Sequence, residues 1–302
     1  MIELIKNPHI DFLGKRYIAF VFSGILSIIG IIAIVQIATG RANLGIDFAG
    51  GTAIQFKFEN PVALHNVRLA LESGGVKDFD LQDLPSVNKI LIRVKKSEQE
   101  LGKGSETITS ILSQKFPENK YVVDSTTVIG PKVGGRLKAD AAKAVAFAVI
   151  GILVYVAFRF QFKFGVGATI ATFHDVLAVL GLFYIMGKEI NLILVTALLT
   201  IAGYSLTDTV VVFDRIRENL NKMVGISFAQ VVNESILQKL ARSLSTSLTV
   251  ILTLVSLLVF GGESIRWFIV ALLIGIVSGT YSSIFNAAPL LVIWEERGKS
   301  KK

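Results

Sequence analysis

Long apolar runs alternate with short polar segments along most of the chain. A helix rises about 1.5 Å per residue and a bilayer core is about 30 Å thick, so a run of about 20 apolar residues can cross a membrane. The first run is longer than the apolar core of a secretory signal peptide, which is about 7–15 residues. We therefore predict an uncleaved first span and six spans in all, over 17–38, 139–158, 165–186, 190–213, 242–262 and 267–294.

The intervening region, 39–138, has the pattern of a separate domain. Alternating apolar residues predict a strand at 52–59, and helix-like spacing follows at 61–72. Further strands are predicted at 76–84, 88–95 and 121–129, with a second helix at 98–116. The order βαββαβ is that of a ferredoxin-like sheet with two helices on one face. The predicted fold class is thus a six-helix polytopic membrane protein with one external ferredoxin-like α+β domain between helices 1 and 2.

The positive charges predict the orientation of these spans. The formal net charge is +8, and Lys and Arg gather beside the ends of apolar runs, whereas a nucleic-acid binder would gather them on one soluble face. The short loops on one side hold only Lys188 and Arg266. By the positive-inside rule, we expect 1–16, the connection 214–241 and the tail 295–302 in the cytoplasm, and the 39–138 domain outside.

Two further features refine this picture. The amphipathic stretch 228–241, within the cytoplasmic connection, is predicted to lie along the membrane surface. The chain contains no Cys, so disulfides and thiol chemistry are excluded.

One carboxylate, Asp208, lies inside the fourth apolar run. A charge there costs roughly 2.5–3.5 kcal/mol on insertion scales, so it should face protein or water. Tyr204 stands one turn before it, and in the fifth span Arg242 and then Thr246 begin a second polar stripe at similar depth. Our hypothesis is that Asp208 carries protons. Lost hydration would favour its protonated form, and attraction to Arg242 would favour its charged form. A structural ion pair and an Arg242 that snorkels to the headgroups are the alternatives.

The pair His174-Asp175 lies near the middle of the third span. Adjacent helical residues point about 100° apart, so we expect these side chains on different faces. Asp175 is a candidate for a proton or water path, and His174 is either part of that path or a packed hydrogen-bonding residue. The other histidines, His9 and His65, lie in separate segments, so we expect no metal site and no cofactor.

Glycine-rich motifs occur at two places. The stretch 45–51 begins at Gly45, contains Asp47 and ends in Gly50-Gly51, but it lacks the Lys and Ser/Thr of a phosphate loop. We expect it to be structural, with the glycines turning the backbone sharply into the first strand. The last span contains the close-packing motif Gly-x-x-x-Gly at 275–279, directed within the bundle or at a partner.

No hydrolase triad and no carboxylate pair suited to glycoside chemistry is evident in the sequence. We therefore do not expect an enzyme.

Four stretches resemble the motifs of one family. The segments 45–51, 174–176, 203–219 and 242–247 are similar to those of the SecD/SecF family of protein-export membrane proteins, in the resistance-nodulation-division superfamily. The similarity covers nearly the whole chain, and Thr207 stands where the family often has Asn.

The resemblance implies a six-span half bundle in the bacterial cytoplasmic membrane with SecD as obligate partner. It further implies contact with the SecYEG channel, the translocating preprotein and lipid, with YajC and YidC as additional candidate partners. Asp208 and Arg242 match the family's essential acid and base, which implies proton-motive-force-assisted, SecA-dependent export. The alternatives are a small-molecule efflux component of the same superfamily and a translocon scaffold that moves no protons.

Overall fold

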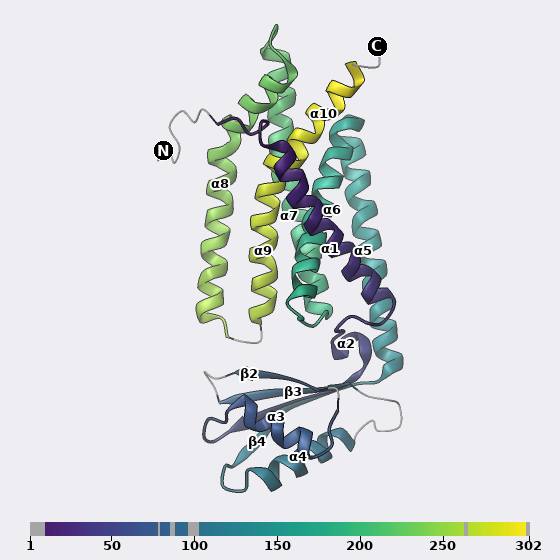
Figure 1. Cartoon of the computed structure of the whole chain (residues 1–302), viewed down its shortest axis with the longest axis vertical. Coiled ribbons are helices and arrows are strands. Elements are labelled where there is room, and N and C mark those ends of the chain that lie inside the picture. The colour runs from purple at the N-terminus through teal and green to yellow at the C-terminus, as the bar shows by residue number, and fades with distance from the viewer. Residues whose placement is uncertain (1–9, 78, 85–87, 96–102, 263–264, 300–302) are drawn as a thin grey trace.

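The computed structural model describes residues 10–77, 79–84, 88–95, 103–262 and 265–299. Six helical segments are long and apolar enough to cross a membrane, which confirms the predicted number of spans (Figure 1). They are α1 (Arg16–Ala38), α5 (Pro131–Arg159), α6 (Phe162–Ile185), α7 (Leu192–Lys222), α8 (Phe228–Phe260), and a last segment made of α9 (Arg266–Ser282), the π-helical turn η4 (Ser283–Ala287) and α10 (Ala288–Lys299).

Several helices extend beyond the apolar runs. α5 begins at Pro131, inside the range predicted for the external domain, and the predicted connection 214–241 consists mostly of the ends of α7 and α8. The amphipathic stretch does not form a separate surface helix. Its apolar side chains Val232 and Ile236 are buried in a cluster with Ile216 of α7, so the end of α7, rather than lipid, covers that face.

The external domain has the predicted ferredoxin-like topology. Its elements are β1 (Gly51–Phe58), α3 (Leu64–Ser73), β2 (Phe79–Leu84), β3 (Lys89–Lys95), α4 (Lys103–Lys115) and β4 (Tyr121–Ile129). The antiparallel strands lie in the order β2-β3-β1-β4. Alternate side chains of β1, among them Ile54 and Phe56, are fully buried with Leu71 of α3 and Leu112 of α4. The first part of the predicted 98–116 helix lies outside the described residues.

The glycine-rich stretch joins α1 to this domain through the short helix α2 (Ile46–Ala49). Gly50 and Gly51 have φ of 75° and 145°, in the region that favours glycine. A Cβ on Gly50 would lie 2.9 Å from the first Cα of α5, so the chain turns there with no room for a side chain. Asp47 Oδ2 accepts a hydrogen bond of 3.0 Å from the first backbone N–H of α7. A carboxylate is favoured at a helix N-terminus, so Asp47 fixes the linker to α7.

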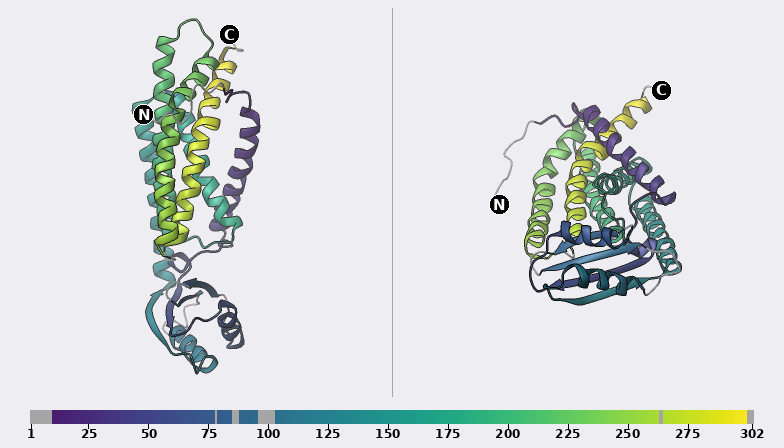
Figure 2. Two further views of the ribbon diagram at one scale, coloured as in Figure 1. Left: turned by 90° about the vertical axis from the view of Figure 1, so that its left-hand side faces the viewer. Right: turned by 60° about the horizontal axis from the view of Figure 1, so that its bottom comes forward.

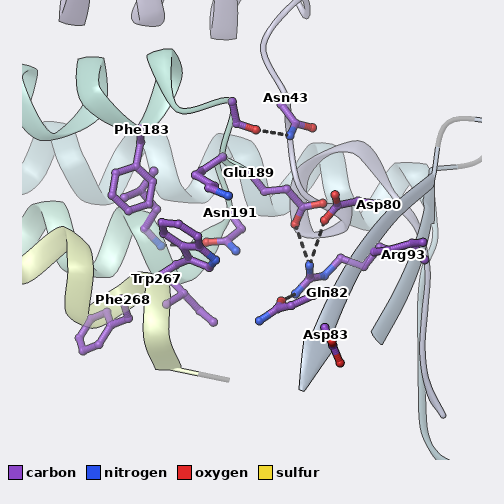
Figure 3. Close-up of a pocket in the computed structure, with 15 residues that line it drawn as sticks. Asn43, Asp80, Gln82, Asp83, Arg93, Phe183, Glu189, Asn191, Trp267 and Phe268 are labelled. Carbon is purple, nitrogen blue, oxygen red and sulfur yellow. Dashed lines mark hydrogen bonds and ion pairs between the residues drawn. The ribbon is translucent and has the colours of Figure 1, made fainter. Parts of the chain in front are cut away.

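A polar pocket of about 290 Å³ lies where the sheet meets the loop between α6 and α7 (Figure 3). Arg93 of β3 extends toward that loop, and its Nη1 lies 3.5 Å from both Asp80 Oδ2 and Glu189 Oε2. On the membrane side, Lys188 Nζ lies 4.0 Å from the ring centroid of Trp267. The shared Arg93 cation therefore ties the external domain to the membrane part.

α1 lies along one side of the bundle and crosses α6 obliquely (Figures 1 and 2). At the crossing, a Cβ on Gly181 would lie 2.8 Å from Gly30 N, and a Cβ on Gly30 would overlap the Leu177 carbonyl oxygen. The two backbones therefore touch, as small residues at helix crossings allow.

We predict that Gly30→Ala lowers the free energy of unfolding by about 1–3 kcal/mol, because the added methyl group overpacks this crossing. The measurement is thermal unfolding in detergent. Gly24→Ala is the matched control in the same helix, since no described heavy atom lies within 4 Å of its Cβ position. Equal stability of the two variants would show that the crossing tolerates separation.

We predict that Glu189→Gln makes the external domain more mobile relative to the membrane helices. The substitution removes the Arg93–Glu189 attraction and leaves the Arg93–Asp80 pair within the sheet. An ion pair of this kind contributes about 1 kcal/mol at most when partly exposed. The readout is the distribution of distances between spin labels on cysteines introduced into α3 and α8 of this Cys-free chain. Asp124→Asn, which removes a pair with Lys89 inside the sheet, should leave the distribution unchanged.

Candidate functional site

Two carboxylates lie inside the helix bundle, one on α6 and one on α7. Asp175 is fully buried, whereas Asp208 is half-buried. In an apolar setting each oxygen needs hydrogen-bond donors, because an unpaired buried charge is costly. The serines of α7, α8, α9 and η4 supply them.

Asp175 is held by four side chains from three helices. Its Oδ2 accepts hydrogen bonds from Ser205 Oγ at 2.5 Å and Ser282 Oγ at 2.6 Å. Its Oδ1 accepts from Ser278 Oγ at 2.7 Å and lies 3.0 Å from His174 Nδ1. The expectation that His174 and Asp175 point apart is wrong: both side chains are long enough to bend toward each other along the helix surface. This donor set matches the acceptor capacity of an ionised carboxylate.

Asp208 lies one turn beyond Ser205 on α7 and has two serine donors. Ser243 Oγ of α8 donates to Oδ1 at 2.7 Å, and Ser283 Oγ of η4 donates to Oδ2 at 2.7 Å. Ser283 directly follows Ser282, which bonds Asp175. The two carboxylates are therefore connected through one pair of adjacent residues, at the point where α9 passes into the π-helical turn. Such turns within α-helices often occur at functional sites.

The glycines of the last span bring these serines close to α7. A Cβ on Gly275 would overlap the side chain of Ile201, and one on Gly279 would lie 3.3 Å from Ser205 Cβ. The Gly-x-x-x-Gly face thus packs against α7 within the bundle. Because α9 approaches so closely, Ser278 and Ser282 come within hydrogen-bond distance of the Asp175 carboxylate.

The predicted contact between Asp208 and Arg242 is absent among the described residues, where no ion pair or hydrogen bond joins the two side chains. Arg242 is exposed, and the next residue, Ser243, faces α7 instead. Consecutive helical residues point about 100° apart, and here Ser243 is the one that faces α7. α8 is rotated so that its predicted polar stripe faces away from Asp208.

Of the other two residues predicted beside Asp208, Tyr204 faces the bundle interior and Thr246 does not. Tyr204 Oη lies 3.3 Å from Ser247 Oγ, which lies 2.6 Å from Thr280 Oγ1, so Tyr204 belongs to a hydroxyl chain across α7, α8 and α9. Thr246 is exposed and donates to the Arg242 carbonyl oxygen at 2.9 Å, away from the carboxylates.

The serines of the last span were not predicted. Ser278 and Ser282 are four residues apart in a mostly apolar run, which places them on one helix face, and Ser283 directly follows Ser282. That spacing is the signal that could have identified them. Over the part of the chain that the structure describes, no group of three His, Cys, Asp or Glu side chains could hold a metal ion.

Two family models match the chain. The model of the C-terminal region of the protein export membrane proteins SecD/SecF matches residues 108–297, and the SecD/SecF GG motif matches residues 37–62. The chain is 51% identical to the protein translocase subunit SecF of Thermodesulfovibrio yellowstonii over 97% of each chain. It is 43% identical to that of Calditerrivibrio nitroreducens over 97% of this chain and 96% of the relative.

The fold is also that of solved SecDF proteins. The crystal structure of the translocon-associated membrane protein SecDF from Thermus thermophilus matches with a TM-score of 0.82 and 35% identity, covering 96% of this chain and 39% of that one. SecDF in its super-membrane-facing form matches with a TM-score of 0.73 and 34% identity, over 98% and 40%. This chain spans about two-fifths of those solved chains. It is a multi-pass membrane protein of the bacterial cytoplasmic membrane, and it belongs to the SecD/SecF family of protein-export membrane proteins.

Proposed function

We propose that this chain is the SecF-type subunit of a protein-export complex that uses the proton-motive force to assist translocation through SecYEG. The observation that carries the proposal is the connection of Asp175 to Asp208 through Ser282 and Ser283. The names of the relatives, translocase subunits, support the export role. The solved SecDF chains are much longer than this one, which supports a SecD partner that corresponds to the rest of those chains.

No hydrogen bond joins Ser282 Oγ to Ser283 Oγ in the part of the chain that the structure describes, so proton transfer along this connection requires one of these hydroxyls, which can both donate and accept, to turn toward the other. When Asp208 gains a proton, it no longer needs two donors, so Ser283 can turn away. An alternative acceptor is already in place, because Ser283 Oγ lies 3.0 Å from the Thr280 carbonyl oxygen, and Ser282 Oγ lies 3.2 Å from that of Gly279. Each serine thus has two acceptors within reach, and protonation of the carboxylates selects between them.

This switch would act on the shape of the last span. The serines lie at the start of η4, where the backbone deviates from α-helical geometry. Movement of their bonds from carboxylates to backbone carbonyls would change the local helical pitch and shift α10 relative to α9. That shift is the conformational step that we assign to the proton cycle.

The role of Arg242 in this proposal differs from the sequence hypothesis. It stands next to Ser243, which bonds Asp208, so it supplies a neighbouring positive charge without direct contact. Its exposed side chain points to the face of α8 that also bears Thr246.

The exposed face of α7 and α8 suits a partner half bundle. Only 17% of the residues in the most apolar stretch of α8 are buried in this chain, compared with 61% for α6. Hydroxyl-bearing residues, among them Thr200, Thr207 and Thr249, are exposed on these two helices. We assign this face to SecD, with both chain termini in the cytoplasm and the external domain on the far side. YajC and YidC stay candidate partners on the resemblance alone.

We predict that Asp208→Asn abolishes the stimulation of preprotein translocation by the proton-motive force, with a loss of at least about tenfold, because the amide has no titrating proton. The measurement is export into inverted membrane vesicles containing the complete complex. Asp214→Asn is the matched control, since that carboxylate is on the same helix but is partly exposed and pairs with Arg159. Full stimulation in Asp208→Asn at normal abundance would instead support a scaffold that moves no protons.

We predict that Ser283→Ala reduces proton-driven export several-fold while ATP-driven export persists, because it breaks the hydroxyl connection and leaves both carboxylates in place. Ser245→Ala is the control, as Ser245 Oγ bonds only to the Ala241 carbonyl oxygen of its own helix. If both variants export equally well, Ser283 is a packing residue and not part of the proton route.

A further inference from the structure

A cavity of about 370 Å³ lies on the side of the bundle away from α8, between α1, α6 and the η4–α10 segment. Its walls are mostly apolar, with Phe20, Phe173 and Leu290 among them. It lies on the N-terminal side of the close crossing of α1 and α6 at Gly30.

Two polar side chains line this cavity and have an unpartnered atom. His174 and Asn286 are each 6% exposed, and His174 Nε2 and Asn286 Nδ2 have no hydrogen-bond partner among the described residues. The opposite end of each side chain is fixed: His174 Nδ1 bonds Asp175, and Asn286 Oδ1 accepts from Ser23 Oγ at 2.9 Å. The unpartnered atoms are therefore the ends that remain for an occupant of the cavity.

The chemistry of these atoms indicates what that occupant is. Asp175 accepts hydrogen bonds, so His174 Nδ1 donates and Nε2 of the neutral ring is an acceptor, whereas Asn286 Nδ2 is a donor. A lipid chain would satisfy neither atom. Water satisfies both, and the hydroxyls of Ser23 and Ser27 on the wall offer further partners.

We propose that this cavity is a hydrated port, and that His174 passes protons between its water and Asp175. The proposal rests on the proton-driven function proposed above and adds a second access to the carboxylates, opposite Asp208. His174 is the titratable group among the residues that line the cavity; Asp175 and the ring of Tyr281, centred 6.5 Å away, face it from the bundle. Ser205 and Ser282 lie beyond Asp175 and are uncharged.

The transfer balances without any other reactant. A hydrated proton binds Nε2 and leaves water behind, and the Nδ1 proton passes to Asp175 Oδ1. The ring is then neutral again, with its hydrogen on Nε2, and it must return to the Nδ1–H tautomer before it can take a second proton from the port. The reverse sequence releases a proton to the port. From Asp175 the route continues through Ser282 and Ser283 to Asp208.

Filling the port with an apolar side chain tests this role. Gly24 lines the cavity, and no described heavy atom lies within 4 Å of its Cβ position, so Gly24→Leu adds an apolar side chain at an open point of the wall. Gly151→Leu is the matched control on α5, where the Cβ position is equally open. We expect at least a several-fold loss of proton-driven export in Gly24→Leu and none in Gly151→Leu. His174→Gln, which keeps a polar group but cannot carry a proton, should lose export similarly and flatten its pH dependence.

These results separate the port from the proposed function. If Gly24→Leu and His174→Gln export normally while Asp208→Asn is inactive, the port is wrong and the proton-driven function stands. If Asp208→Asn is active, the proposed function itself fails.

Hydration is measured independently in the assembled complex. Because the chain has no Cys, Ser27→Cys provides a single thiol on the cavity wall, and Gly151→Cys provides one on α5. A small water-soluble thiol reagent should modify Ser27→Cys and spare Gly151→Cys. An inert Ser27→Cys in correctly assembled protein would overturn the hydrated cavity.

Discussion

The requirement to provide hydrogen bonds for a buried carboxylate organises this bundle. Asp175 has no solvent contact, so it is compatible with a membrane interior only while hydroxyl and imidazole groups surround it. Those donors come from α6, α7 and α9, so the three helices must keep their rotation and spacing. Gly279 is part of the same requirement, because the serines beside it reach the carboxylate only when α9 lies close to α7.

Charge in an apolar run was the strongest signal in the sequence, and it identified both carboxylates. The spans and the βαββαβ order were also predictable, since apolar runs and alternation depend on local composition. The rotation of α8 was not, because it depends on which neighbours a helix meets. A rotation of one residue position replaced Arg242 by Ser243 as the contact of Asp208. The serines of the last span were overlooked because serine is compatible with many helical environments.

The external linker has a mechanical consequence. Asp47 is bonded to the first turn of α7, and Glu189, in the loop just before α7, pairs with Arg93 of the sheet. Both attachments therefore lie at the N-terminal end of α7, the helix that bears Asp208 further along. An axial shift of α7 would therefore act on both attachments of the external domain at once. The position of the external domain is thereby coupled to the helix that holds the carboxylate.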